Sequence, residues 1–114
     1  MPRAMQVRIA EQAKALMEED LSKPQTIASL ANALCVSETT LKEAFRATFG
    51  CPVSTWYRRL RIESAAKMLL EEGCPVGVAA SRVGYANPSK FSAAFASVMG
   101  SSPRVWVAAR RDLR

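Results

Sequence analysis

The side chains best suited to hydrogen bonding with a partner lie in the predicted helix over residues 37–49, SETTLKEAFRATF. Its apolar residues, Leu41, Ala44 and Phe45, recur at helical spacing and are expected to face inward. The opposite side then presents hydroxyl, ammonium, carboxylate and guanidinium groups, which belong to Ser37, Thr39, Thr40, Lys42, Glu43 and Arg46. Such a face either contacts a polar partner or is an ordinary solvated surface.

A second helix of the same kind is predicted to follow Asn87, which is a strong N-cap candidate because Pro88 occupies the first helical position. Phe91 and Phe95 are expected to face inward. The outward residues are then Asn87, Ser89, Lys90, Ser92 and Ala93. This face is smaller and less charged than the first.

The chain offers little for catalysis or metal binding. It has no histidine, and its three cysteines, Cys35, Cys51 and Cys74, lack the paired short spacing of a zinc site or a disulfide framework. There is also no evident pair of carboxylates in a cleft and no glycine-rich phosphate loop. We therefore expect a protein that is not an enzyme and has no catalytic residues, metal or cofactor.

The chain is short, and its net positive charge favours an acidic partner. The 114 residues carry a net charge of +6, and residues 74–114 hold +5 of it, with six basic residues against one acidic residue. Nucleic acid is one such partner, although solvated basic faces are also common. No apolar run is long enough to span a membrane and no signal peptide is visible, so we expect no membrane partner and a cytoplasmic location.

Helical periodicity, caps and breakers together predict an all-α protein. One segment, over residues 52–72, is long enough to span ~30 Å, close to one turn of duplex DNA at roughly 34 Å. The turns fall at Cys35–Val36 and at Gly84. The expected helices cover residues 5–20, 26–34, 37–49, 52–72, 75–83, 88–99 and 103–112.

The sequence repeats itself on either side of the long helix. Leu41, Phe45, Gly50 and Trp56 correspond to Phe91, Phe95, Gly100 and Trp106 at a separation of fifty residues, whereas Ala31 and Leu34 correspond to Ala80 and Val83 at a separation smaller by one. The second turn is therefore expected to be one residue longer. A short helix, a turn and a capped helix, present twice, indicate two helix-turn-helix units on a helical spacer. A pair of packed helices in a small bundle is the alternative for either unit alone.

Over about residues 5–110 the chain resembles the DNA-binding domain of the AraC/XylS family of bacterial transcription regulators. The resemblance rests on LANALCVSETTLKEAFRATFG, on VGVAASRVGYANPSKFSAAFASVMGSSP, and on Trp56, Arg61, Ile62, Ala65 and Leu69 between them. It implies seven helices in two helix-turn-helix subdomains, residues 1–51 and 74–114, joined by a linking helix over residues 52–73.

The function implied by the resemblance is sequence-specific binding of double-stranded DNA for transcriptional regulation, with two recognition helices in successive major grooves. An activator with RNA polymerase as a further partner is the expectation, and a repressor stays the open alternative. In the family such domains are attached to an effector-sensing domain, so we expect this chain to be a fragment that lacks that covalently attached domain.

Base contacts are expected, by the same resemblance, from Thr39, Lys42 and Glu43 in the first unit. In the second unit the candidate base readers are Ser89 and Ser92, which lie on the outward face of the helix. Lys42 is suited to guanine O6 and N7, and Glu43 to cytosine N4. Small serines leave readout to water or to a thymine methyl group. Phosphate contacts are expected from Thr26, Ser37, Arg46, Arg58 and Lys90. Arg61 is expected to lock the linking helix to a subdomain by an ion pair.

The second unit departs from the family pattern at three positions. Ala96 stands where a basic residue is usual, Ala93 where a base-reading side chain is common, and Val107 where an arginine is usual. We therefore expect the second unit to bind weakly or to read few bases. The alternative function is a helical protein-interaction module without DNA binding, whose partner binding would be insensitive to salt.

Overall fold

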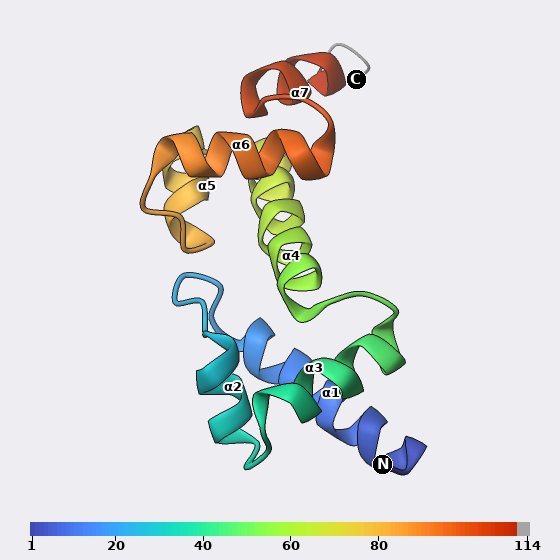
Figure 1. Ribbon diagram of the computed structural model, residues 1–114. Coiled ribbons are helices and arrows are strands. Elements are labelled where there is room, and N and C mark those ends of the chain that lie inside the picture. Colours follow the sequence, from blue (N-terminus) through green and yellow to red (C-terminus); the bar gives the residue numbers. More distant parts are fainter. Residues whose placement is uncertain (112–114) are drawn as a thin grey trace. The chain divides into compact units, whose positions relative to one another are not determined.

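The computed structural model describes residues 1–111 and confirms an all-α fold of seven α-helices (Figure 1). No strand occurs among these residues. The predicted end of the last helix, Asp112, lies outside the described residues. The helices are α1 (Arg3–Glu19), α2 (Ile27–Ala33), α3 (Glu38–Phe49), α4 (Val53–Lys67), α5 (Val76–Arg82), α6 (Pro88–Met99) and α7 (Pro103–Arg111), with a π-helical turn η1 (Met68–Glu72) after α4.

The chain divides into two compact units. Unit 1 comprises Met1–Asp20 and Pro24–Tyr57, and unit 2 comprises Leu21–Lys23 and the chain from Arg58 onward. The boundary lies within α4, which contributes buried Val53 and Tyr57 to unit 1 and buried Ile62 to unit 2. The linking helix therefore contributes side chains to both cores.

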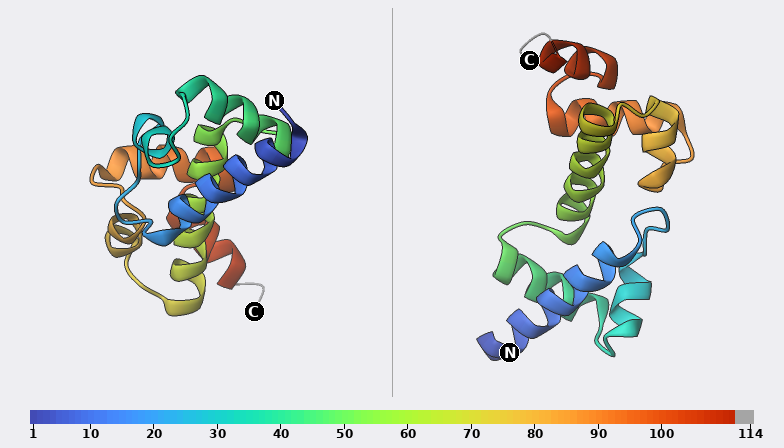
Figure 2. Two further views of the ribbon diagram at one scale, coloured as in Figure 1. Left: turned by 90° about the horizontal axis from the view of Figure 1, so that it is seen from below. Right: turned by 180° about the vertical axis from the view of Figure 1, so that it is seen from behind.

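Unit 1 packs α1 against α3, as both views of Figure 2 show, with α2 beside them. The Tyr57 hydroxyl accepts a 3.0 Å hydrogen bond from the backbone N–H of Gln25, which fixes the segment before α2 to the start of α4. The fully buried residues are small or aliphatic apart from Phe45. They are Ala10, Ala13, Met17, Leu30, Leu41, Ala44 and Phe45.

Unit 2 packs α5, α6 and α7 around the second part of α4 and η1 (Figure 1). Its core is richer in aromatic side chains, because phenylalanine stands at position 91 where unit 1 has Leu41. Its buried residues are Ile62, Ala65, Ala66, Leu69, Ala79, Ala80, Val83, Phe91, Phe95 and Trp106.

The two units repeat the same aromatic contact. Phe45 meets Trp56 edge-on with 5.7 Å between the ring centroids, and fifty residues later Phe95 meets Trp106 edge-on at 5.7 Å. Edge-to-face pairs of this kind add about 0.5–1.5 kcal/mol beyond the burial of their area. The sequence repeat thus reflects a repeated packing arrangement.

The turns of the two helix-turn-helix units also match. In unit 1 the N–H of Val36 bonds to the carbonyl of Ala31 across Cys35, which has a φ of 57°. In unit 2 the N–H of Tyr85 bonds to the carbonyl of Ala80 across a glycine with a φ of 85°. This is the bonding of a Schellman motif, which requires a left-handed residue. After it, Val36 is followed at once by its helix cap, whereas Ala86 intervenes in unit 2 and accounts for the longer turn.

The linking helix is not α-helical to its end. The sequence predicts one helix over residues 52–72, but the last turn, Met68–Glu72, is π-helical and ends at Gly73 with a φ of 65°. Three consecutive apolar residues, Met68, Leu69 and Leu70, all contact the core of unit 2 there. A π-helical turn holds more residues than an α-helical turn, so it changes which side chains face inward.

Within residues 1–111, no helix is long and apolar enough to cross a membrane. In the same part of the chain, no group of three or more acidic or cysteine side chains is arranged to hold a metal ion.

Candidate nucleic-acid interface

The recognition helix of unit 1 is α3, and its ends are fixed by local hydrogen bonds. Ser37 Oγ accepts from the backbone N–H of Thr40 at 3.1 Å and donates to Thr40 Oγ1 at 2.9 Å. Glu38 lies in the first turn, where its negative carboxylate interacts favourably with the positive end of the helix dipole. Gly50 ends the helix with a φ of 77°. The side chain of Ser37, predicted to contact phosphate, is thus engaged as the cap.

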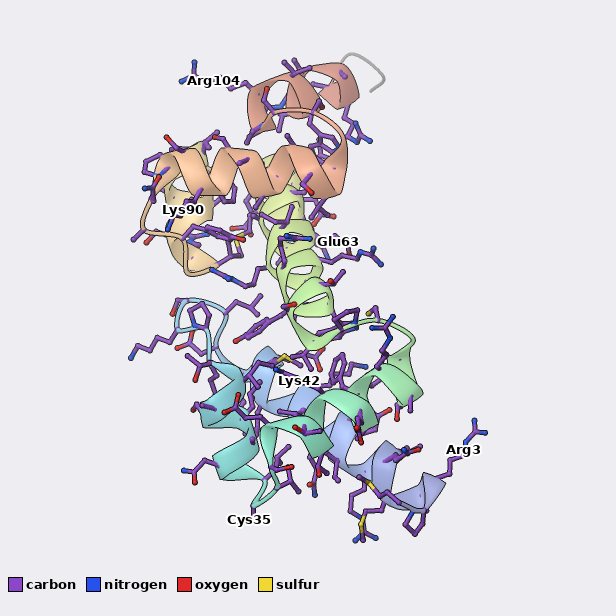
Figure 3. The ribbon with its side chains drawn as sticks, in the orientation of Figure 1. Arg3, Cys35, Lys42, Glu63, Lys90 and Arg104 are labelled. Carbon is purple, nitrogen blue, oxygen red and sulfur yellow. The ribbon has the colours of Figure 1, made fainter. Side chains whose placement is uncertain are left out.

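The outward face of α3 has the predicted composition. Leu41, Ala44 and Phe45 are fully buried. On the opposite side Thr39, Lys42, Glu43 and Arg46 are exposed, while Thr40 is half-buried against the cap. Lys42 is labelled in Figure 3. The structure therefore brings three of the predicted base contacts and one phosphate contact onto one accessible surface.

Lys42 and Arg46 also line a hollow of about 340 Å³ with the first residues of two helices. Ile27 belongs to α2, and Val53 and Ser54 to α4; Pro52 completes the wall. The free N–H groups at the start of a helix as long as α4 favour an anion. Two cationic side chains beside them make this hollow, here called the α2–α4 hollow, suited to a phosphate group. The sequence did not predict that Lys42 would share it with Arg46.

The recognition helix of unit 2 is α6, and Asn87 caps it as predicted. Asn87 Oδ1 accepts from the backbone N–H groups of Ser89 at 2.9 Å and Lys90 at 3.1 Å. Ser89, Lys90 and Ala93 are exposed, and Lys90 is labelled in Figure 3. Phe91 and Phe95 are fully buried, as predicted.

Ser92 differs from the other predicted contacts because it is half-buried. It lines a hollow of about 220 Å³ between α5 and the start of α6, together with Ser81, Tyr85, Pro88 and Phe91. Most of these groups are apolar or aromatic. Such a hollow accommodates an apolar group better than a charged one.

Two predicted phosphate contacts lie outside the recognition helices. Thr26 is exposed and caps α2, since its Oγ1 accepts from the N–H of Ser29 at 3.0 Å. Arg58 is exposed on α4, at the first position of unit 2.

Arg61 forms a lock between α4 and the turn of unit 2. Its Nε donates to the carbonyl of Val83 at 2.7 Å, and its guanidinium carbon lies 4.1 Å from the centroid of the Tyr85 ring. Arg61 therefore holds α4 to the turn of unit 2 at least through a carbonyl and an aromatic ring, while the expected ion pair stays a prediction.

Comparisons with known proteins agree with this arrangement. A family model described as a helix-turn-helix domain matches residues 30–109. An AraC-like transcription regulator from Streptomyces antibioticus is 36% identical over 95 residues, which cover 83% of this chain but 31% of that protein. The chain thus spans about a third of the length of that relative.

Two solved structures carry the same fold. The C-terminal domain of AraT, a response regulator from Geobacillus stearothermophilus, is 30% identical with a TM-score of 0.85, covering 89% of this chain and 84% of that one. The DNA-binding domain of AdpA, a global transcriptional factor solved in complex with a target DNA, is 27% identical with a TM-score of 0.84, covering 93% and 95%. With two capped helix-turn-helix units on a shared helix, the chain belongs to the AraC/XylS family of helix-turn-helix domains.

Proposed function

We propose that this chain binds double-stranded DNA sequence-specifically to regulate transcription, with α3 and α6 in successive major grooves. The observation that carries the proposal is the exposed polar face of α3, which adjoins the cationic α2–α4 hollow. A recognition helix reads base edges while neighbouring basic groups hold the backbone phosphates. The neighbour AdpA, whose DNA-binding domain was solved on DNA, supports the same use of the fold.

In unit 1, Thr39, Lys42 and Glu43 read bases from the exposed face of α3. Arg46, one turn beyond Lys42, neutralises a phosphate at the α2–α4 hollow. Thr26 and Ser37 contribute mainly by capping, because their side-chain oxygens already accept backbone N–H groups. In this proposal the helix starts that they cap face the DNA backbone.

In unit 2, Ser89 and Ser92 read bases, and Lys90 and Arg58 contact phosphates. The half-buried Ser92 sits in an apolar hollow with Pro88 and Tyr85. Because a thymine presents a methyl group in the major groove, this hollow favours thymine at the corresponding base pair.

Membership of the family also suggests a location, a role and partners for the regulator. We propose that it acts in the cytoplasm as an activator, that RNA polymerase is a partner, and that an effector-sensing domain belongs to the same regulator. The chain matches 31% of its relative from Streptomyces antibioticus, which leaves room for such a domain in that protein.

Selection of bound sites from a random pool of duplexes tests the proposal. Fluorescence anisotropy on a selected duplex should then show log affinity falling by about 0.9 per unit of log salt for each phosphate neutralised. Binding that is flat in salt, with no enriched sequence, would favour the alternative of a protein-interaction module.

A further inference from the structure

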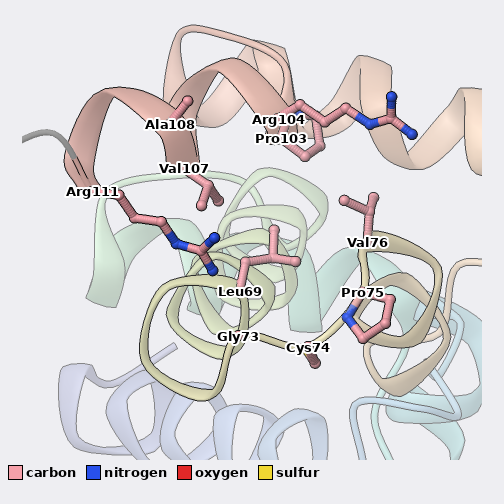
Figure 4. Close-up of a pocket in the computed structure, with 10 residues that line it drawn as sticks. All are labelled: Leu69, Gly73, Cys74, Pro75, Val76, Pro103, Arg104, Val107, Ala108 and Arg111. Atoms are coloured by element: carbon pink, nitrogen blue, oxygen red, sulfur yellow. The ribbon is translucent and has the colours of Figure 1, made fainter.

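Unit 2 also has a hollow beside the starts of two of its helices, although no residue of the recognition helix α6 lines it. This hollow of about 300 Å³ is lined by Val76 at the start of α5 and by Pro103 and Arg104 at the start of α7 (Figure 4). These residues correspond through the repeat to Ile27, Val53 and Ser54, which line the hollow of unit 1. We call the second one the α5–α7 hollow.

The two hollows carry their positive charge at different positions. In unit 1 the charge comes from Lys42 and Arg46 on the recognition helix. The equivalent residues of α6 are Ser92 and Ala96, which are uncharged. In unit 2 the charge comes instead from α7, which contributes Arg104 and Arg111 to the lining. Arg104 stands at the position where unit 1 has an uncharged serine.

We infer that Arg104 holds a backbone phosphodiester of the duplex for unit 2, in place of the basic residue that α6 lacks. This assignment rests on the proposed function. It adds a phosphate contact on α7, a helix to which no contact is otherwise assigned. It also implies that the second unit is a weak reader of bases but still a holder of the DNA backbone, because a phosphate contact positions the protein without specifying sequence.

The conformation of Arg104 suits this role better than that of its neighbours on α7. Arg110 stacks on the Trp106 ring with its guanidinium carbon 4.0 Å from the centroid. Arg111 turns toward Gly73, where its Nη2 would lie 3.8 Å from an added Cβ. Figure 4 shows the Arg104 side chain extended away from Arg111 and Gly73. Arg104 is exposed, no acidic residue occupies the first turn of α7, and no carboxylate within residues 1–111 pairs with it.

The test moves the positive charge of unit 2 from position 104 to position 96, which corresponds to Arg46 of unit 1. Arg104→Ser should lower the salt slope of duplex binding by about 0.9 and weaken binding about three- to tenfold. Adding Ala96→Arg to that variant should restore both quantities, because Ala96 is exposed and corresponds to Arg46. The full chain is used, with a selected 30-base-pair duplex and a random-sequence duplex of the same length as probes. Since a phosphate contact is blind to sequence, both probes should lose affinity alike.

Matched controls separate this contact from general charge. Arg8→Ser removes one positive charge from an exposed position of α1 and should change the slope by less than about 0.3. Arg104→Lys should keep most of the affinity. Circular dichroism confirms that each variant is folded.

The outcomes distinguish this inference from the proposed function. If the wild-type chain binds the duplex with a salt-dependent affinity and Arg104→Ser leaves the salt slope unchanged, the assignment of Arg104 alone is overturned. A double variant that regains neither the affinity nor the salt slope would overturn it as well. A wild-type chain that binds neither duplex would overturn both.

Discussion

Arg61 Nε, on α4, donates a 2.7 Å hydrogen bond to the carbonyl oxygen of Val83, which is the C-cap residue of α5. The same guanidinium lies over the Tyr85 ring, and Tyr85 meets Phe91 of the recognition helix edge-on at 5.5 Å. A continuous set of contacts thus runs from the linking helix through the turn to α6. We therefore expect the position of the second recognition helix to depend on this arginine.

Replacing Arg61 with lysine should lower the free energy of unfolding by about 1–2 kcal/mol. Lysine keeps the charge but lacks the planar guanidinium that both stacks on Tyr85 and donates from Nε. Urea denaturation followed by circular dichroism measures the change. Arg59→Lys, at an exposed position of the same helix, is the control and should change stability by less than about 0.5 kcal/mol. Equal effects of the two substitutions would contradict the lock.

Cys35 occupies the left-handed turn position that glycine fills in the second unit. Cys35→Gly should raise the free energy of unfolding by about 0.5–1 kcal/mol, because the cysteine is exposed and a side chain at a φ of 57° is strained. Thermal unfolding measures it. Gly84→Ala, at a φ of 85°, is the converse substitution and should lower stability by about 1–2 kcal/mol. A loss of stability in Cys35→Gly would show that the thiol makes a contact that outweighs the strain.

Lys42 and Arg46 share a hollow but are expected to differ in what they contribute to binding. Lys42→Ala should relax the preference at one base pair, with about 1–3 kcal/mol less discrimination against the other bases there. Arg46→Ala should weaken binding to all duplexes alike and lower the salt slope by about 0.9. Repeating the site selection and the salt series with each variant separates the two effects. If Lys42→Ala leaves the selected sequence unchanged, Lys42 is a second phosphate contact in the α2–α4 hollow rather than a base reader.

Features set by nearby residues were predictable from the sequence. Ser37 and Asn87 cap the two recognition helices, and Leu41 and Phe45 face inward, because caps and periodicity act within one or two turns. The longer second turn was predictable from the offset of the repeat.

Features that depend on packing between distant segments were not predictable. Ser92 is half-buried because residues of α5 and the turn surround it, and Lys42 joins Arg46 because the start of α4 closes their hollow. The π-helical turn η1 arises where Met68, Leu69 and Leu70 meet the core of unit 2. Periodicity describes one helix at a time and says nothing of what packs against it.

The linking helix offers the last test, because it contributes to both units. Inserting Gly-Gly between Arg58 and Arg59, two exposed residues at the unit boundary, should interrupt α4 and leave both cores intact. Here a box is the stretch of base pairs that one unit recognises. If the helix sets the spacing of the two recognition helices, affinity for a selected duplex with two boxes should fall about 10- to 100-fold. The reason is that the first unit no longer holds the second at a fixed separation. Binding to a duplex with the first box alone should stay within about twofold, and anisotropy on the two duplexes measures both. An insertion between Ser64 and Ala65 is the contrasting control: Ala65 is fully buried, so that variant should lose the fold of unit 2 as well. Equal losses on the two duplexes with the Arg58–Arg59 insertion would rule out a spacing role for the helix.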